Sequence, residues 1–200
     1  MPLQNRVLPD GSIVAIPDRG GWMGNRGGRI HDPKTRTLHP SRRWASKRWI
    51  TCKLSFKNRQ RAVMGRSYTE LFFFDEAVSF AAGHRPCFEC RRDDATAFQQ
   101  ALKAGGWSDV SADTIDQHLH AERTSEGKTV SVSGFRALPV GTMARLKDGT
   151  FACVSAERSI VRWSWSKGYH QSEIKFNQSL QLLTPLSVIM ALENGYQMRW

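Results

Sequence analysis

The residues best suited to chemistry lie in the stretch HRPCFECRR, residues 84–92. Cys87 and Cys90 are three positions apart, and a Cys-x-x-Cys turn directs both sulfurs into one hollow, as in half of a tetrahedral zinc site. His84 lies three residues before Cys87, so seven residues offer three donors. A complete structural site takes a further ligand from elsewhere in the chain. The spacing therefore predicts a zinc-binding knuckle with Cys87, Cys90 and His84 as ligands.

The chain has four cysteines, the other two being Cys52 and Cys153. Four in 200 residues are too few for a disulfide scaffold, so the Cys-x-x-Cys pair indicates a metal or redox site in a reducing compartment. Cys52 shares one face of an expected strand over residues 48–56 with Ile50, because side chains alternate along a strand. This places its thiol toward the interior, where one interpretation is a buried structural cysteine.

The net charge of +11 is concentrated in the first third of the chain. Residues 1–66 hold 15 Lys and Arg against 3 Asp and Glu, whereas the remainder is close to neutral. Such asymmetry favours a polyanionic partner, most simply nucleic acid, although a basic surface also serves solubility. The candidate contacts lie in a glycine-rich stretch, in a tryptophan-containing stretch and around the knuckle: Arg26, Arg29, Arg42, Arg43, Lys47, Arg48, Arg85, Arg91 and Arg92.

Membrane association is not expected from this sequence. It contains no run of about 18 apolar residues of the kind that spans a bilayer. Its first residues lack the apolar centre of a signal peptide. A cytoplasmic location is the expectation.

The apolar pattern predicts an α+β protein. Helices are expected over residues 75–82, 94–104 and 111–123, each beginning at a capping residue, and a last short helix over about 186–193. Alternating or apolar runs after Lys128 predict several strands. We therefore expect a basic N-terminal region, residues 1–124, with the zinc knuckle in a core at about 49–104. A β-rich lobe with the final helix would occupy residues 125–200 and pack against it.

The segment YTELFFFDEAVSFAAGHRPCFECRR, residues 68–92, resembles the N-terminal zinc module of the Ada family of bacterial alkylation-repair proteins. Both have an aromatic run, a short alanine-rich helix and Arg-Pro-Cys-x-x-Cys followed by basic residues. The stretches GNRGGRIHD, YTELFF and GHRPCFECRR also resemble the shared motifs of a family of uncharacterised bacterial proteins of about the same length.

The Ada resemblance implies a zinc ion held by four thiolates, one of which accepts a methyl group from a DNA phosphotriester. Cys87 and Cys90 match the second ligand pair, Arg85 matches the preceding arginine, and Cys52 matches the first thiol. Phe56 stands where the family has its other thiol. Either a histidine, such as His84 or His31, completes a Cys3His site, or the metal has been lost.

Three functions remain open at this point. The first is zinc-dependent nucleic-acid binding, with DNA favoured over RNA, in DNA repair or processing. The second is a hydrolytic or lyase-type enzyme acting on nucleic acid or nucleotides, for which Glu70 and His31 would form an acid/base pair. Cys52 is a further catalytic candidate, as a methyl acceptor. The third is a metal-free interaction module.

Overall fold

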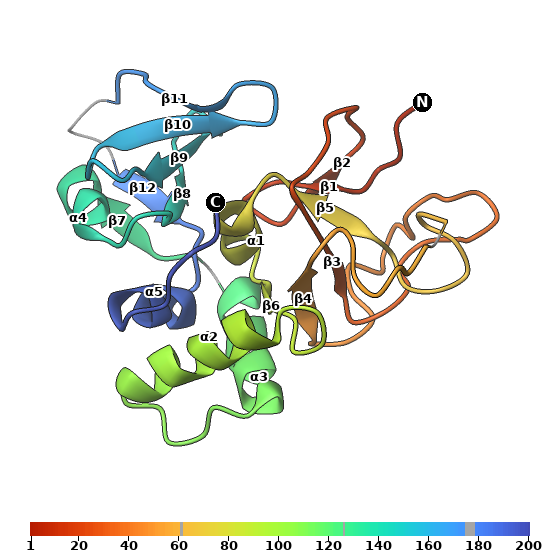
Figure 1. The fold of residues 1–200 in the computed structure, drawn as a ribbon. Coiled ribbons are helices and arrows are strands. Elements are labelled where there is room, and N and C mark those ends of the chain that lie inside the picture. The colour runs from red at the N-terminus through yellow and green to blue at the C-terminus, as the bar shows by residue number, and fades with distance from the viewer. Residues whose placement is uncertain (61, 126, 175–178) are drawn as a thin grey trace.

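The computed structural model describes residues 1–60, 62–125, 127–174 and 179–200. Within these residues the chain forms two six-stranded sheets and five helices, so the expected α+β class is confirmed. One sheet comes from the first half of the chain and the other from the second half (Figure 1).

The first sheet has the strand order β2-β1-β5-β3-β4-β6. Its strands are β1 (Arg6–Val7), β2 (Ile13–Val14), β3 (Trp22–Arg26), β4 (Trp49–Cys52), β5 (Leu71–Phe73) and β6 (Arg85–Pro86). The central strand β3 pairs antiparallel with both β4 and β5, while β4 pairs parallel with β6. The two strands that carry the chemistry of the knuckle, β4 and β6, therefore lie together at one edge.

The two faces of the first sheet differ in character. Met23 of β3 is in register with Cys52 on one side and Phe72 on the other. Because side chains alternate along a strand, these three residues share one face, and Leu71 and Phe73 occupy the other. Leu71 and Phe73 belong to the main hydrophobic core. The face that carries Cys52 is therefore the one turned away from that core.

Helix α1 (Glu76–Ala81) leads from β5 to the knuckle. Asp75 caps its first turn by accepting a hydrogen bond from the backbone N–H of Val78 at 2.9 Å. Gly83 ends it with a φ of 78°, a left-handed conformation that glycine adopts without strain. The short strand β6, which the sequence pattern did not predict, then leads into the knuckle.

The second sheet has the strand order β11-β10-β9-β8-β12-β7. Its strands are β7 (Thr129–Ser131), β8 (Met143–Arg145), β9 (Phe151–Val154), β10 (Ile160–Ser164), β11 (Gly168–His170) and β12 (Ser179–Leu182). Helix α4 (Val132–Ala137) follows β7 directly, although the alternation in VSVSG, residues 130–134, predicts a strand there. The reason is local, because the Ser131 hydroxyl accepts a hydrogen bond from the Gly134 N–H at 3.1 Å and caps the helix.

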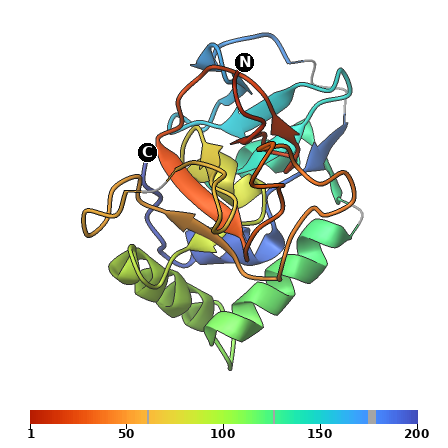
Figure 2. The same cartoon turned by 90° about the vertical axis from the view of Figure 1, so that its right-hand side faces the viewer.

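Three helices form a layer below the sheets (Figures 1 and 2). They are α2 (Arg92–Ala104), α3 (Ala112–Thr124) and α5 (Leu186–Glu193), which pack around Phe80 and Phe98. The predicted final helix over 186–193 is confirmed, and α2 begins two residues earlier than expected. In the part of the chain that is described, none of the helices combines the length and apolar character needed to cross a bilayer.

Candidate metal centre

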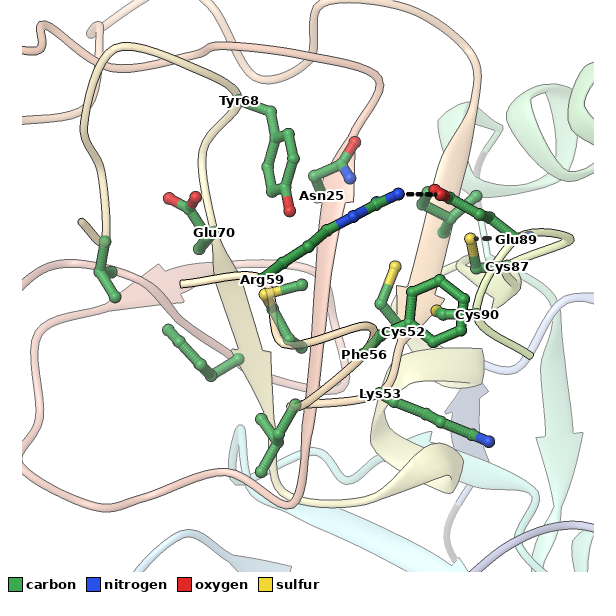
Figure 3. Close-up of a pocket in the computed structure, with 15 residues that line it drawn as sticks. Asn25, Cys52, Lys53, Phe56, Arg59, Tyr68, Glu70, Cys87, Glu89 and Cys90 are labelled. Atoms are coloured by element: carbon green, nitrogen blue, oxygen red, sulfur yellow. Dashed lines mark hydrogen bonds and ion pairs between the residues drawn. The ribbon is translucent and has the colours of Figure 1, made fainter. Parts of the chain in front are cut away.

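The sulfur atoms of Cys52, Cys87 and Cys90 all lie within 4.8 Å of one another. Cys52 ends β4, and the other two belong to the turn that follows β6. The pairing of β4 with β6 brings them together, and the N–H of Cys87 donates to the carbonyl oxygen of Thr51 at 3.0 Å. All three thiols are free and buried, and Figure 3 shows them beside one another at one side of a pocket. The predicted grouping of these three cysteines is what the structure shows.

The knuckle is held in shape by its own backbone. The N–H of Arg91 donates to the carbonyl oxygen of Cys87 at 2.9 Å, and the N–H of Glu89 points at the Cys87 sulfur at 3.4 Å. Hydrogen bonds from backbone N–H groups stabilise the anionic form of an acceptor. The turn is therefore arranged to receive negative charge on sulfur.

The three thiols share their protons unequally. Hydrogen bonds from the thiols of Cys52 and Cys90 lower the pKa of Cys87 well below the usual value. The pKa of Cys52 is raised in turn, because its proton is held between the sulfurs of Cys87 and Cys90 and because the residue is buried. One thiolate thus forms readily and the loss of further protons is opposed. A divalent cation that replaces those protons removes this opposition.

The donor set suits a soft or borderline metal ion such as zinc, which binds thiolates in tetrahedral sites. Three cysteine sulfurs would supply three of the four ligands. The remaining thiol, Cys153, lies in β9 of the second sheet and is buried there, as expected for a core cysteine. It is not part of the cluster.

A cavity of about 290 Å³ lies against the thiols on the face of the first sheet turned away from the core. Residues of the segment between β4 and β5 line it together with the cysteines. The other lining side chains are apolar and polar: Met23, Asn25, Ile50, Lys53, Leu54, Phe56, Arg59, Val63, Tyr68, Glu70, Phe72 and Glu89. Arg59 extends from this segment across the pocket to an ion pair with Glu89 (Figure 3).

Glu70 lies in this pocket, away from the thiols (Figure 3). Its side chain is buried, and its Oε2 atom accepts a hydrogen bond from the Met64 N–H at 2.7 Å. Its Oε1 atom is buried with no hydrogen-bond partner among the described residues. Within that part of the chain, Glu70 is therefore not paired with an arginine.

His84 does not lie with the thiols, contrary to the expected ligand set. Its ring packs between Trp49 and Phe73, with centroid distances of 5.0 and 4.7 Å. The side chain is 0% exposed, and neither ring nitrogen has a hydrogen-bond partner in the described part of the chain. Burial, assisted by the positive charges of Arg26 and Arg123, lowers its pKa well below the usual value. His84 is thus a neutral core residue on the opposite face of the sheet from Cys52.

His31 is also engaged elsewhere. One ring nitrogen lies 2.5 Å from the hydroxyl of Thr69 and the other 2.8 Å from the carbonyl oxygen of Gly65. It fastens the chain leading into β5. Among the described residues no hydrogen bond joins it to Glu70, and the expected acid/base pair is not formed.

Three of the arginines expected to contact nucleic acid are buried. Arg85 forms a two-point ion pair with Asp116 at 2.9 and 2.7 Å. Arg91 pairs with Glu76 and, at 2.9 Å, with Asp94. Arg26 donates to the carbonyl oxygen of Gly11 at 2.6 Å and stacks on the ring of Trp49. These side chains are fixed inside the protein and do not face a polyanion.

The other six predicted contacts are exposed. They are Arg29, Arg42, Arg43, Lys47, Arg48 and Arg92. Four of them fall in the loop before β4, where Trp44 is 38% exposed. The Trp44 ring packs on Trp49 and His120 at centroid distances of 6.1 and 5.2 Å.

Sequence reasoning missed the partners that bury these arginines and the side chains that complete the pocket. Asp116 lies 31 positions from Arg85, and Glu76 lies 15 positions from Arg91. Asn25, Arg59 and Tyr68 reach the pocket from β3 and from the segment between β4 and β5. No spacing rule links positions so far apart, although the alternation along β3 places Asn25 on the same face as Met23.

No protein-family model, curated protein or solved structure matches this chain. The similarity to the Ada module is therefore not supported by the fold or by a family assignment. What the structure establishes is a cluster of three buried cysteines able to hold a metal ion such as zinc.

Proposed function

We propose that the protein binds zinc through Cys52, Cys87 and Cys90 and binds nucleic acid through the basic loop, residues 41–48. The observation that carries the proposal is the convergence of three free thiols at the edge of the first sheet, beside β4. The basic loop leads directly into β4, so the strand that supplies Cys52 also anchors the loop.

The basic loop presents cations with an aromatic side chain among them. Arg42, Arg43, Lys47 and Arg48 are exposed, and Trp44 lies between them in sequence. Arginine and lysine neutralise phosphates, and an exposed aromatic ring stacks on unpaired bases. Of these four cations, Arg48 is ion-paired in the described part of the chain, with the exposed Asp113 at 3.4 Å and with the buried Asp116 at 3.8 Å.

Several contacts hold the base of the loop. The guanidinium groups of Arg26 and Arg123 both lie over the Trp49 ring, at 4.0 and 3.9 Å from its centroid. Arg123 also donates to the carbonyl oxygen of Lys47 at 2.7 Å, which ties the loop to α3. A metal ion that joins Cys52 to the knuckle would fix β4 and, through Trp49, this anchor. Nucleic-acid binding is therefore expected to depend on zinc.

The test is fluorescence anisotropy with labelled single- and double-stranded DNA and RNA between about 50 and 200 mM salt, a range over which phosphate contacts lose affinity steeply. Replacing Arg42, Arg43, Lys47 and Arg48 with Gln should weaken binding. It should also flatten the plot of log K against log salt by roughly 0.7 to 0.9 for each phosphate that the variant no longer neutralises. The matched control replaces four exposed lysines elsewhere with Gln: Lys103, Lys128, Lys147 and Lys167. Equal losses in both variants, or a flat salt response of the wild type, would contradict the proposal.

Zinc dependence is tested on the same protein. Removal of metal with a chelator should abolish or strongly weaken oligonucleotide binding, and added zinc should restore it. Unchanged binding by metal-free protein would support an interaction module without metal.

A second candidate is the hydrolytic or lyase-type enzyme, favoured by the free Oε1 atom of Glu70 in the pocket beside the thiols. Oligonucleotides and nucleotides incubated with zinc-loaded protein would give a product that the Glu70→Gln variant does not form. Absence of product with zinc-loaded wild type would leave binding as the function.

A further inference from the structure

Two groups on different sides of the pocket lack a partner. A metal ion on the three thiols would lack a fourth ligand, and the Oε1 atom of Glu70 lacks a hydrogen-bond donor. We propose that the pocket binds one guanine base, with a ring nitrogen on the metal and the N–H edge on Glu70. This inference rests on the proposed function and deepens it, because it assigns a base-selective site in addition to the basic loop.

The metal side follows from the number of donors. Among the described residues, the group able to hold a metal consists of three cysteines, with no histidine or carboxylate in it. Tetrahedral zinc takes four ligands. Since the thiols line the cavity, a molecule in the cavity is placed to supply the fourth.

The other side follows from Glu70. A buried oxygen without a partner is unfavourable, and buried polar groups in native proteins are normally satisfied. The Glu70 carboxylate is held in place by the Met64 N–H, while its free Oε1 atom belongs to a side chain that lines the cavity. The ligand should therefore carry an N–H donor.

The distance between the two sides selects the size of the ligand. Cys52 of β4 and Phe72 of β5 lie on either side of Met23 of β3. Neighbouring strands are about 4.8 Å apart, so the two outer strands are separated by about 10 Å. Glu70 precedes β5 and, two residues before Phe72, shares its face, so its backbone is at least this far from Cys52. One metal-bound water is too small to bridge such a gap, whereas a ring system with functional groups on opposite edges is large enough.

The walls of the cavity suit a flat ring. Met23, Ile50, Phe56, Val63 and Phe72 provide apolar surface, and a cavity of about 290 Å³ is close to the smaller ligand sites of proteins, roughly 300 Å³. Lys53 and Arg59 also line the pocket. Arg59 is paired with Glu89, so Lys53 is the cation that would meet the phosphate attached to the base.

Guanine meets both needs among the nucleic-acid bases. Its N7 atom is an acceptor with a free lone pair, and its N1 and N2 groups donate at the opposite edge. Zinc binds aromatic ring nitrogens of this type, such as the imidazole nitrogen of histidine. Adenine has the same N7 atom but presents a lone pair at N1, which would face the Glu70 carboxylate and be repelled.

The experiment uses the full chain loaded with cobalt(II), whose visible spectrum reports changes in the ligands. Guanosine monophosphate should change this spectrum in a saturable manner. Adenosine monophosphate should act more weakly, and 7-deazaguanosine monophosphate, which lacks the N7 lone pair, should leave the spectrum unchanged. The proposal would be overturned if all three nucleotides changed the cobalt spectrum equally, or if guanosine monophosphate left it unchanged.

The Glu70→Gln variant tests the second contact. Loss of a hydrogen bond to a charged group should weaken guanosine monophosphate binding by about 10-fold to 150-fold. The matched change Glu157→Gln, at an exposed carboxylate in the turn between β9 and β10, should have no effect. Equal affinity of both variants would refute the role of Glu70.

A ligand without guanine distinguishes failure of the base site from failure of the proposed function. Salt-dependent binding of oligothymidine, which contains no guanine, reports on the basic loop alone. If oligothymidine binds and guanosine monophosphate leaves the cobalt spectrum unchanged, the base site is wrong and the basic loop stands.

Discussion

At the scale of single residues, neighbours in the sequence have opposite roles in this protein. Arg91 is buried against Glu76 and Asp94, while Arg92 beside it is exposed. The sequence presents both as basic residues following the knuckle. Composition predicted a basic surface but did not distinguish a surface arginine from one that neutralises a buried carboxylate.

This difference gives a stability prediction. Arg91→Met should lower the free energy of unfolding by about 3 to 5 kcal/mol, because it leaves the buried Glu76 carboxylate without its cation. Arg92→Met should change it by less than about 0.5 kcal/mol, as is usual for an exposed position. Urea unfolding followed by tryptophan fluorescence measures both. Similar values for the two variants would contradict the account of Arg91.

His84 predicts a pH dependence. Burial lowers its pKa in the folded protein, whereas the unfolded chain protonates near the ordinary value of 6.5. The unfolded state therefore binds more protons below pH 6.5. Between that pH and the lowered pKa of the folded state, the His84 contribution reduces the free energy of unfolding by up to about 1.4 kcal/mol for each pH unit. His84→Phe should reduce the loss of stability between pH 6.5 and acid conditions.

The control for that measurement is His39→Phe, at an exposed histidine. This variant should keep the wild-type dependence on pH. If His84→Phe also follows the wild-type curve, then the folded protein protonates His84 as readily as the unfolded chain does.

At the scale of elements, β3 determines the geometry of the site. Gly24 lies at its centre, and a Cβ atom there would lie 2.2 Å from the carbonyl oxygen of Ile50 and 2.8 Å from the Phe73 ring. The backbone of β4 approaches closely because Gly24 has no side chain. The position of Cys52, two residues after Ile50, depends on that approach.

Gly24→Ala should therefore destabilise the protein by several kcal/mol, because overpacking and backbone shifts carry a cost of about 1 to 3 kcal/mol. If β4 moves to relieve the contact, Cys52 moves with it, and the affinity for zinc should fall. Thermal unfolding and zinc titration measure the two effects. The same change at Gly134, in α4, should stay within about 1 kcal/mol of the wild type. Zinc affinity and unfolding of Gly24→Ala equal to those of the wild type would show that β3 does not position the thiols.

Elements with local signals were predictable from the sequence. The caps at Asp75 and Ser111 marked helices α1 and α3, and the alternation around Cys52 marked β4. The face on which His84 lies was not predictable. It follows from β6, whose pairing with β4 places the thiols on one face of the sheet and the imidazole on the other. Spacing in the sequence counts residues but does not assign them to a face.

At the scale of the whole molecule, the two sheets share one core. The main cluster contains Leu71 and Phe73 from the first sheet, Ala77 and Val78 from α1, and buried side chains of the second sheet: Met143, Phe151, Cys153, Val161 and Trp163. Tyr169 also donates a hydrogen bond to Asp75, the cap of α1, at 2.6 Å. The boundary near residue 124 between two lobes remains a prediction. The first sheet, which carries the metal site, packs against the second sheet in this shared core.

The central claim is that three cysteines bind one metal ion, and metal analysis of the purified protein tests it most directly. Inductively coupled plasma mass spectrometry should find one zinc ion for each wild-type chain, and loss of that ion in Cys52→Ser, Cys87→Ser and Cys90→Ser. Cys153→Ser, the matched change at the buried thiol outside the cluster, should retain it. Wild-type protein that takes up no metal after incubation with zinc, or equal metal content in all four variants, would contradict the account.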